Sequence, residues 1–380
     1  MEHLNKKFNL DLDLLYKIIN IDIEKLKNAF YFLLSKKQLY GQFFTTNQEY
    51  ILQGMFIPDN ITKIIEPFTG NGDLLNFINN IDKYNIECYD IDPKKDFIIK
   101  KDTLLNPPNY NNSFIITNPP YLARNKSSNK NYFEKYDVND LYKCFIKELT
   151  TNLCLGGIII IPLNFFSSIR KSDIELRKLF LSKYEIILLN IFEEQVFSDT
   201  TYTVCSFQFS IKLNNNSSNK LNIMIYPKKI NIQTELNDNN NYLIGGDIYN
   251  LITNNKYTIT RLTTKNKDRA NTNIYVKCID DNENSKISLS INNNRYIDET
   301  PNLTARTYAT LLIEPSIDNN KQKILVDKFN EFINEQRQKY HSLFLTNYRE
   351  SKDIARKRIS FELVYSIVDY LLYQMDQLNL

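Results

Sequence analysis

Residues 63–73 read KIIEPFTGNGD, and this stretch decides the fold class of the chain. A short apolar run ends at Glu66, and a turn containing Gly70 and Gly72 follows before helical spacing begins. In α/β folds, an acidic residue at a strand end followed by a glycine-rich turn and a helix binds a nucleotide-like cofactor. The glycines allow a tight turn and a close approach of the backbone to the ligand. The G-x-G spacing lacks the third glycine of the dinucleotide fingerprint and does not match it.

Short apolar runs on both sides of this stretch predict a series of strands. They occupy residues 64–65, 86–89, 97–99, 114–116, 157–161, 186–190 and 204–211. Segments with helical spacing separate several of these runs, at residues 73–81, 141–153 and 173–183. Strands that alternate with helices favour a mostly parallel sheet, and the last two runs, on either side of Phe197, are typical of a closing hairpin. The predicted fold class is therefore α/β, with a Rossmann-like sheet that is mostly parallel and closes with an antiparallel hairpin.

The pattern also divides the chain into three parts. Residues 1–40 carry amphipathic helical spacing and are expected to form N-terminal helices. Residues 41–213 hold the strand series, and a polar tract without apolar periodicity begins at residue 214, where we expect a domain boundary or a long surface loop. Residues 214–380 are expected to form a second, α+β domain. Its strand-like runs lie at 221–226, 257–262 and 274–278, and its helical spacing at 318–345 and 352–378.

The net charge neither demands nor excludes nucleic acid as a partner. There are 47 basic and 44 acidic side chains, which leave a net charge of +3, and a basic binding face can coexist with an acidic face elsewhere. Local clusters are more informative. Arg124, Lys126 and Lys130 form one basic stretch, within a Lys-, Asn- and Ser-rich segment (122–136) that we expect to be a mobile loop that orders on substrate. A second basic stretch, residues 352–358, can contact phosphates.

Cysteine and histidine usage argues against a zinc site. The five cysteines are scattered and never spaced as CxxC, and His3 and His341 are the only histidines. Such thiols are typical of a reducing compartment. The N-terminus is too polar for a signal peptide, and no apolar run approaches transmembrane length. The sequence therefore predicts a soluble, intracellular protein with no metal and no membrane partner.

Two further acidic residues follow the glycine turn. Asp90 ends the next predicted strand, about 20 residues after the glycines, where a carboxylate can accept hydrogen bonds from both hydroxyls of a ribose. Asp102 comes near the end of the third apolar run and can accept a hydrogen bond from the amino group of an adenine. The order and the spacing of these residues strengthen the prediction of a nucleoside site.

The sequence Asn118-Pro119-Pro120-Tyr121 directly follows the predicted strand at 114–116. The two prolines make this turn rigid, because each fixes φ and restricts the residue before it. Rigidity would keep the Asn118 side-chain oxygen and the Pro119 carbonyl facing one point. Two acceptors that converge on one point suit a planar NH2 group, because they localise its nitrogen lone pair for attack. Tyr121 would offer a ring for stacking against a base.

A similar stretch, Asn106-Pro107-Pro108-Asn109, lies 12 positions earlier. It lacks the aromatic residue, and no apolar strand leads into it. It also lies too close to Asp102 to leave room for another strand. We therefore expect a loop at this position.

Taken together, these motifs resemble those of the S-adenosylmethionine-dependent DNA amino-methyltransferases with the gamma motif order. Residues 41–46, GQFFTT, are similar to the first cofactor motif of that family, with Thr46 in place of its usual proline. Glu66–Gly72 is similar to its E-P-x-x-G-x-G motif, and Asn118–Tyr121 to its N-P-P-Y motif. The resemblance covers roughly residues 38–212. It implies a methyltransferase domain at 41–213, a target-recognition domain at 214–380, and methylation of N6 of an adenine that has swung out of double-stranded DNA.

The resemblance also implies roles for individual residues. Those expected to bind S-adenosylmethionine are Thr45, Glu66, Pro67, Phe68, Gly70, Gly72, Asp90, Ile91 and Asp102. The catalytic residues at the target base would be Asn118, Pro119, Pro120 and Tyr121. Phe197 would face the flipped base, although ordinary core packing explains an aromatic residue there equally well. Arg124 and Lys126 would contact the substrate. No metal is implied, and a cognate restriction endonuclease is a partner that such enzymes often have.

Other reactions remain open from the sequence. N4-cytosine methylation also uses an amino group, but Ser-Pro-Pro-aromatic is the commoner motif there, so Asn118 favours adenine. RNA adenine methylation and protein glutamine methylation are further alternatives. A fourth is a decayed methyltransferase fold that serves only as a nucleic-acid-binding module. Methylation of C5 of cytosine is excluded, because that reaction needs a cysteine nucleophile, commonly after proline, and none of the five cysteines follows a proline.

Overall fold

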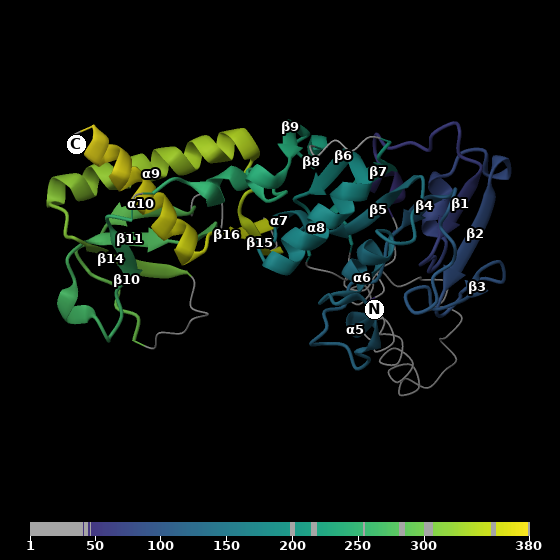
Figure 1. Ribbon diagram of the computed structural model, residues 1–380, viewed down its shortest axis with the longest axis horizontal. Helices are drawn as coiled ribbons and strands as arrows, with labels where there is room; N and C mark the ends of the chain where they lie inside the picture. The colour runs from purple at the N-terminus through teal and green to yellow at the C-terminus, as the bar shows by residue number, and fades with distance from the viewer. Residues whose placement is uncertain are drawn as a thin grey trace, which may run out of the picture. The chain divides into compact units, whose positions relative to one another are not determined.

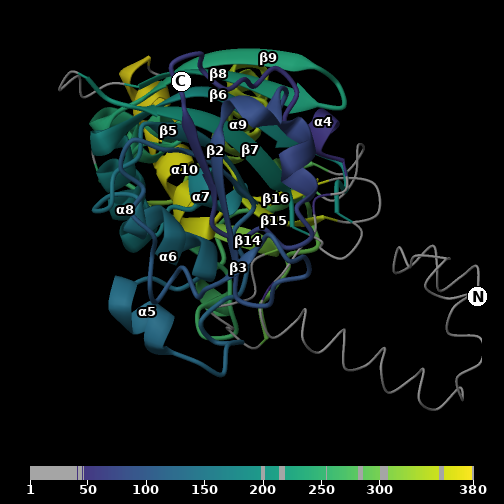
Figure 2. The same cartoon turned by 90° about the vertical axis from the view of Figure 1, so that its right-hand side faces the viewer.

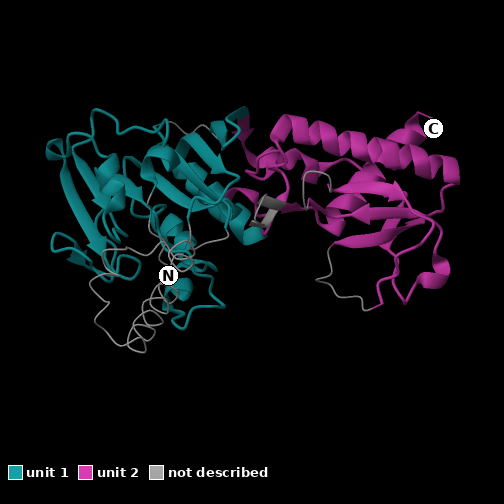
Figure 3. Ribbon diagram, turned by 180° about the vertical axis from the view of Figure 1, so that it is seen from behind, with its two compact units in different colours: residues 1–165, 171–233 teal, residues 166–170, 234–380 magenta. Residues whose placement is uncertain are grey.

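The protein is described from a computed structural model. It describes residues 41, 45, 47–197, 202–213, 219–253, 255–280, 286–299, 307–350 and 355–378, with backbone alone for 347–350 and 355–356. The helices predicted for residues 1–40 lie outside this range. The chain forms two compact units (Figure 3): unit 1 comprises residues 1–165 and 171–233, and unit 2 comprises residues 166–170 and 234–380.

Unit 1 is built on a sheet to which nine strands of the described chain belong, in the order β3-β2-β1-β4-β5-β7-β6-β8-β9 (Figure 1). The strands are β1 (Lys63–Glu66), β2 (Asn85–Asp90), β3 (Ile99–Lys100), β4 (Phe114–Thr117), β5 (Gly156–Pro162), β6 (Tyr184–Phe192), β7 (Val204–Ile211), β8 (Asn219–Tyr226) and β9 (Ile230–Leu236). Strands β3, β2, β1, β4 and β5 are parallel, whereas β7 lies antiparallel between β5 and β6. The predicted α/β class and its closing hairpin are therefore confirmed.

The helices of unit 1 are mostly short. They are α4 (Gln48–Ile51), α5 (Asn131–Tyr136), α6 (Leu141–Glu148), α7 (Asn164–Ser167), which ends within unit 2, and α8 (Lys171–Lys183). The predicted helix at 73–81 is instead the 3-10 turn η1 (Asp73–Phe77), and a second such turn, η2 (Ile81–Lys83), follows. Helices α6 and α8 lie together on one side of the sheet, and α4 and η1 lie together on the other (Figure 2).

The main sheet extends beyond the boundary that the sequence suggests at residue 214. Strand β8 pairs parallel with β6 and buries Leu221, Ile223 and Ile225. The polar tract that begins at 214 therefore lies between two strands of one sheet. The compact units separate at 233–234, about one hairpin later. Apolar alternation in β8 outweighs the local polar signal, because burying three large side chains stabilises the strand by several kcal/mol, roughly 2 kcal/mol for each side chain.

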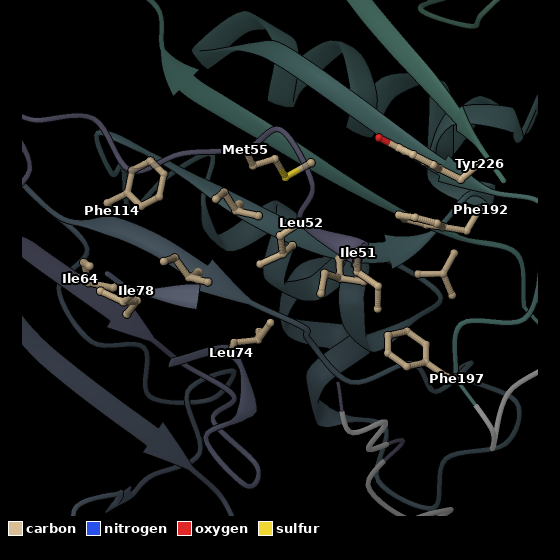
Figure 4. Packing of buried hydrophobic residues seen from close by; sticks show 14 of the residues in the cluster. Ile51, Leu52, Met55, Ile64, Leu74, Ile78, Phe114, Phe192, Phe197 and Tyr226 are labelled. Atoms are coloured by element: carbon tan, nitrogen blue, oxygen red, sulfur yellow. The ribbon is translucent and has the colours of Figure 1, made fainter. Parts of the chain in front are cut away.

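The core of unit 1 lies on both faces of β5. Ile158 and Ile160 belong to a cluster with Ile51 and Leu52 of α4 and with Phe114 of β4 (Figure 4). The alternate residues of β5 face the side that α6 and α8 cover, where Phe165, Phe180, Phe207 and Phe209 pack together. A strand covered on both faces has no solvent-facing position, which explains its uninterrupted apolar run.

Gly157, in the middle of β5, tests how tightly this core is packed. A Cβ atom there would lie 2.5 Å from the Ile115 carbonyl oxygen and 2.9 Å from the Phe209 ring. We expect Gly157→Ala to lower the free energy of unfolding of unit 1 by about 2 kcal/mol, because the backbone of β4 cannot yield cheaply. Hydrogen exchange of β5 peptides during urea titration measures this.

The matched control is Gly54→Ala. Gly54 has a left-handed φ of 79°, but a Cβ there would meet only the flexible Leu188 side chain, at 3.5 Å. Its cost is the backbone strain alone, about 1 kcal/mol. Equal destabilisation by the two variants would contradict the packing argument.

Unit 2 contains two antiparallel sheets and two long helices. Its sheet orders are β10-β14-β11-β13 and β12-β16-β15. The strands are β10 (Thr258–Arg261), β11 (Ile274–Lys277), β12 (Ile279–Asp280), β13 (Ser288–Ile291), β14 (Tyr308–Glu314), β15 (Thr346–Glu350) and β16 (Ala355–Arg358). The 3-10 turns are η3 (Asp238–Asn240), η4 (Gly246–Asn250) and η5 (Lys267–Arg269), and the helices are α9 (Asn319–Tyr340) and α10 (Phe361–Gln377).

The helix predicted at 352–378 begins later in the structure than the sequence indicates. Residues 355–358 form β16, and α10 begins only at Phe361. The Ser360 hydroxyl accepts a hydrogen bond from the Leu363 backbone N–H, which caps the helix at this point. The basic stretch at 352–358 therefore ends in a strand. Its pairing with β12 and β15 is a long-range contact that helical spacing does not reveal.

Candidate active site

A cavity of about 200 Å³ opens at the edge of the sheet where the parallel strands β1, β2 and β4 end. Residues on three strand ends and the turn after β3 therefore converge on one space, as expected for an open α/β sheet. The predicted site residues that line it are Thr45, Glu66, Phe68, Gly70, Asp90, Ile91, Asp102, Asn118 and Pro120. The predicted residues outside its lining are Pro67, Gly72, Pro119, Tyr121, Arg124, Lys126 and Phe197.

The glycine turn is held against the end of β2. The Thr69 backbone N–H donates to the Tyr89 carbonyl at 2.9 Å, and the Gly72 N–H donates to the Thr69 carbonyl at 2.8 Å. Gly70 and Gly72 have left-handed φ values of 55° and 78°, which explains why both positions are glycine. Pro67 supports the same turn from behind, because its carbonyl accepts a hydrogen bond from the Thr103 hydroxyl at 2.9 Å.

Asp90 joins the two motifs that the sequence places about 20 residues apart. One of its carboxylate oxygens accepts a hydrogen bond from the Gly70 backbone N–H at 2.8 Å, and the other accepts one from the Asp92 N–H, also at 2.8 Å. These two bonds fix the carboxylate at the cavity wall. Each oxygen has a further lone pair, so the group can also accept from a ligand hydroxyl.

Glu66 is the most unusual group in the cavity. Its side chain is 1% exposed, and its Oε2 atom has no hydrogen-bond partner among the described residues. Burial raises the pKa of the Glu66 carboxyl well above its ordinary value, and the nearby carboxylates of Asp73 and Asp90 raise it further. A buried carboxyl without a partner destabilises the empty protein. A ligand that brings a positive charge or a hydrogen-bond donor would remove this penalty.

Hydrogen bonds from the turn that follows it and from the segment 122–136 hold the Asp102 carboxylate. Its Oδ1 atom accepts hydrogen bonds from the backbone N–H groups of Leu104 and Leu105, at 3.2 and 3.1 Å. Its Oδ2 atom accepts one from the Tyr132 hydroxyl of α5 at 2.7 Å. Residues 127–129 line the same cavity, so the segment 122–136 forms one of its walls. The mobility expected of this segment stays a prediction.

Asn118 lies at the end of β4, with its side chain at the cavity wall and 9% exposed. Its Nδ2 atom donates to the Thr45 hydroxyl at 3.2 Å. The Tyr121 hydroxyl lies 2.5 Å from Asn118 Oδ1 and 2.9 Å from the Ile160 carbonyl oxygen. Because a phenol has one proton, it donates to one of these oxygens at a time. When the Tyr121 hydroxyl donates its hydrogen bond to the Ile160 carbonyl, Asn118 Oδ1 can accept a hydrogen bond from a ligand amino group.

Gly41, the first residue of the predicted cofactor motif, lies directly against this turn. The Tyr121 backbone N–H donates to the Gly41 carbonyl at 2.9 Å. Gly41 has a φ of 63°, and a Cβ there would come within 2.7 Å of the Tyr121 carbonyl oxygen. A glycine is therefore required for the two motifs to pack, which brings Thr45 within reach of Asn118.

Tyr121 and Phe197 do not face the cavity in this structure. The Tyr121 ring is buried and meets the Tyr142 ring edge-on at 6.2 Å. Phe197 is 2% exposed and belongs to the core cluster of unit 1 (Figure 4). Core packing, the alternative open for Phe197 from the sequence, describes its position here. Contact of either ring with a base stays a prediction that requires the ring to leave its present packing.

Arg124 and Lys126 are exposed on the segment beside the cavity. The Arg124 guanidinium lies 3.8 Å from a Glu134 carboxylate oxygen. Their role in substrate contact also stays a prediction. As expected, residues 106–109 form a loop into which no strand leads, and Asn106 is exposed outside the cavity.

Asp140 is a residue that the sequence analysis missed. Its carboxylate accepts a hydrogen bond from the Leu122 backbone N–H at 3.1 Å, directly after the Asn118–Tyr121 turn. It also occupies the position before α6, whose first residue, Leu141, lines the cavity. An aspartate directly before an apolar helical run is a common N-cap signal and could have drawn attention to this position. Asp140 thus connects the turn, the helix and the cavity wall.

The titration of Asp140 is expected to affect stability. Burial raises the pKa of this carboxyl from 3.8 to about 6, although Lys143 and backbone N–H groups oppose the shift. Between these pH values the folded chain holds more protons than the unfolded chain. The contribution of Asp140 to the free energy of unfolding is therefore largest below pH 4, falls as the pH rises to about 6, and is constant above that.

Asp140→Asn isolates this effect, because the asparagine side-chain oxygen can still accept the hydrogen bond from the Leu122 N–H but does not titrate. The difference in the free energy of unfolding between the parent and the variant should fall by on the order of 2 kcal/mol from pH 4 to 6. Urea unfolding followed by hydrogen exchange of α6 peptides measures it. A difference that does not change over this range would refute the assignment.

The described residues contain no cluster of histidine, cysteine or acidic side chains suited to a metal ion. Within the same residues, no helix combines the length and the apolar character needed to cross a membrane.

With the fold and the cavity established, comparisons place the chain in a class. Residues 16–197 match the sequence model of the Eco57I restriction-modification methylase family. This match confirms the resemblance to DNA amino-methyltransferases that the motifs predict.

Two curated proteins of Haemophilus influenzae are similar to about half of this chain. The type II methyltransferases M.HincII and M.HindII are each 30% identical over 211 residues, which cover 50% of this chain. The match covers 41% and 39% of their respective lengths, so it spans less than half of either relative.

Among solved structures, a type I restriction-modification methyltransferase subunit from Streptococcus thermophilus aligns with 55% of this chain and 54% of its own, at 15% identity and a TM-score of 0.38. The DrdV–DNA complex aligns with 64% of this chain and 35% of its own, at 14% identity and a TM-score of 0.41. These scores are low, and the fold class follows from the strand order of the chain itself.

Proposed function

We propose that this protein is a DNA methyltransferase that transfers a methyl group from S-adenosylmethionine to N6 of an adenine flipped out of double-stranded DNA. The observation that carries the proposal is that Asn118, at the end of β4, shares one cavity with the acidic residues Glu66, Asp90 and Asp102. The match of residues 16–197 to a restriction-modification methylase family supports it.

The chemistry of the cavity fits S-adenosylmethionine. This cofactor carries a positively charged sulfonium and an ammonium group, which suit the buried carboxyl of Glu66 and the half-buried carboxyl of Asp73. Asp90 would hold the ribose hydroxyls, and Asp102 would accept from the adenine amino group. Phe68, Ile91 and Leu104 provide apolar wall for a planar ring. When bound, the cofactor supplies the methyl group.

The residues of the Asn118–Tyr121 turn would prepare the target. Asn118 Oδ1 and the Pro119 carbonyl would accept the two hydrogens of the base amino group and localise its nitrogen lone pair. The two prolines hold these acceptors in place, so little reorganisation is needed at the moment of transfer. The hydrogen bond from Asn118 to Thr45 fixes the orientation of the amide.

Adenine in DNA is preferred over the alternative targets. Asn118, rather than serine, at the first motif position favours adenine over N4 of cytosine. Unit 2, most of which follows unit 1 in the sequence, suits recognition of a DNA duplex better than methylation of a glutamine. A cognate restriction endonuclease is a fitting partner, and a DNA substrate implies that the protein acts where the DNA lies.

Glu66→Gln tests the cofactor site. We expect it to weaken binding of S-adenosylmethionine about 10- to 100-fold, because a hydrogen bond to a charged group contributes roughly 1.5–3 kcal/mol. Isothermal titration calorimetry measures the affinity. The control is Glu87→Gln on the neighbouring strand β2, where Glu87 pairs with Lys63 at 2.8 Å, outside the cavity. Equal affinities of the two variants would argue against a role for Glu66.

Asn118→Ala tests the catalytic turn. We expect turnover on duplex DNA to fall about 100-fold or more, since one preorganised partner of the reacting group is lost, while cofactor affinity stays near that of the parent. Labelled methyl transfer to unmethylated plasmid, with digestion and mass spectrometry of the product, measures both rate and target.

Asn106→Ala is the matched control, because Asn106 stands in the same Asn-Pro-Pro context but is exposed outside the cavity. It should transfer at the parent rate. Near-normal turnover of Asn118→Ala would overturn the proposed mechanism, and label in RNA or glutamine would overturn the proposed substrate.

A further inference from the structure

The sheet β10-β14-β11-β13 of unit 2 has one face covered by helices. Val276, Leu289 and Ala309 point to the covered side and are buried. Helix α9 is fixed to this side of the sheet, because the Asn330 side chain donates to the Leu289 carbonyl at 3.0 Å and accepts from the Leu289 N–H at 2.9 Å. Helices α9 and α10 lie along the same side of this sheet (Figure 1).

The opposite face carries a pair of stacked tyrosines. Strand side chains alternate between faces, so Tyr275 and Tyr308 lie on the face away from Val276 and Ala309. Their ring centroids are 5.8 Å apart, with 17° between the ring planes. Tyr308 is 38% exposed. Large aromatic rings that stack at a partly exposed surface instead of in a core often mark a binding site.

Basic and hydroxyl side chains surround this pair. Lys277 lies directly opposite Tyr308 in the register of β11 and β14, and Ser290 lies opposite Tyr275 on β13. Both point to the face that the tyrosines share. Lys286, two residues before β13, is exposed.

The segment after β13 adds two further side chains of the same kind. The Arg295 Nε–H donates to the Thr272 carbonyl and to Asn273 Oδ1, both at 3.0 Å, and the Arg295 side chain is exposed. Tyr296 is 42% exposed, and its backbone N–H donates to the Thr310 hydroxyl at 2.8 Å. These bonds hold the segment against the tyrosine-bearing side of the sheet.

Two acidic side chains near this sheet are paired with arginines, whereas Glu299, after Tyr296, is exposed. Asp298 pairs with Arg261 at 3.3 Å, and Glu314 pairs with Arg269. Lys277, Lys286 and Arg295 bring three positive charges to this region, against one exposed carboxylate, that of Glu299. A surface that combines cations, small hydroxyls and phenol groups complements the phosphates and sugars of a nucleic acid backbone.

We infer that this tyrosine face, comprising Tyr275, Lys277, Ser290, Arg295, Tyr296 and Tyr308, is the surface of unit 2 that contacts double-stranded DNA. The inference rests on the proposed function and adds to it the place where the duplex is held. Lys277 and Arg295 contact phosphates, and the phenol groups contact the sugar–phosphate backbone and the exposed edges of bases. This surface does not include the turn at Asn118, which belongs to unit 1.

Substitutions in the full-length protein test the inference. Lys277→Ala should weaken binding of a labelled, unmethylated plasmid fragment several-fold. It should also lower the number of counterions released on binding, measured from the slope of log K against log salt concentration, by about one. In the double variant Lys277→Ala, Arg295→Ala this number should fall by about two. Tyr308→Ser should weaken binding at all salt concentrations. The affinity for S-adenosylmethionine should stay unchanged in each.

Lys323→Ala is the matched control, because Lys323 is an exposed lysine of α9, the helix that packs on the other face. It should bind DNA as the parent does. Since Tyr308→Ser can disturb the sheet, hydrogen exchange of the unmodified protein provides an independent measurement. Added DNA should protect peptides of β11 and of the segment after β13.

The outcomes separate this inference from the proposed function. If the parent methylates DNA but the Lys277 and Tyr308 variants bind it like Lys323→Ala, and no protection is seen, the tyrosine face is not the DNA surface and the proposed function stands. If the parent methylates RNA or a glutamine and does not bind duplex DNA, both proposals fall.

Discussion

The hydrogen bond from the Gly70 backbone N–H to the Asp90 carboxylate joins the ends of β1 and β2, and the architecture of the cavity follows from it. Parallel pairing of β1 with β2 and β4 brings the residues after each strand to one edge of the sheet. The bond to Gly70 then fixes the glycine turn beside the carboxylate. Without that turn, Glu66 would not be enclosed and the cavity would lose one wall.

The cavity holds an electrostatic imbalance that a bound cation or hydrogen-bond donor would relieve. Burial and neighbouring carboxyls raise the pKa of Glu66, and burial also raises that of Asp73. Such groups reduce the stability of the empty protein, and stability is commonly exchanged for binding at functional sites. The same cavity contains Asn118, whose amide is oriented by Thr45. In the proposed function, cofactor binding and target activation would be coupled through contacts within unit 1.

The sheets of the two units differ in how their faces are covered. In unit 1 the apolar strand β5 is buried on both faces, and little of its surface is available for recognition. In unit 2 the helices cover one face of the sheet, and the other face presents stacked tyrosines and basic side chains. This division suits a chain in which chemistry and recognition are separate tasks.

The sequence by itself determined the fold class, the strands up to the closing hairpin and nine of the residues that line the cavity. These features depend on local signals: apolar runs, the glycines of the turn and the rigid prolines after Asn118. Only the tertiary structure decided that β8 extends the sheet past residue 214, that Asp140 holds the backbone after Tyr121, and that Phe197 packs in the core. Each of these depends on contacts between residues far apart in the chain, and pairing of that kind leaves no periodic trace in a single sequence.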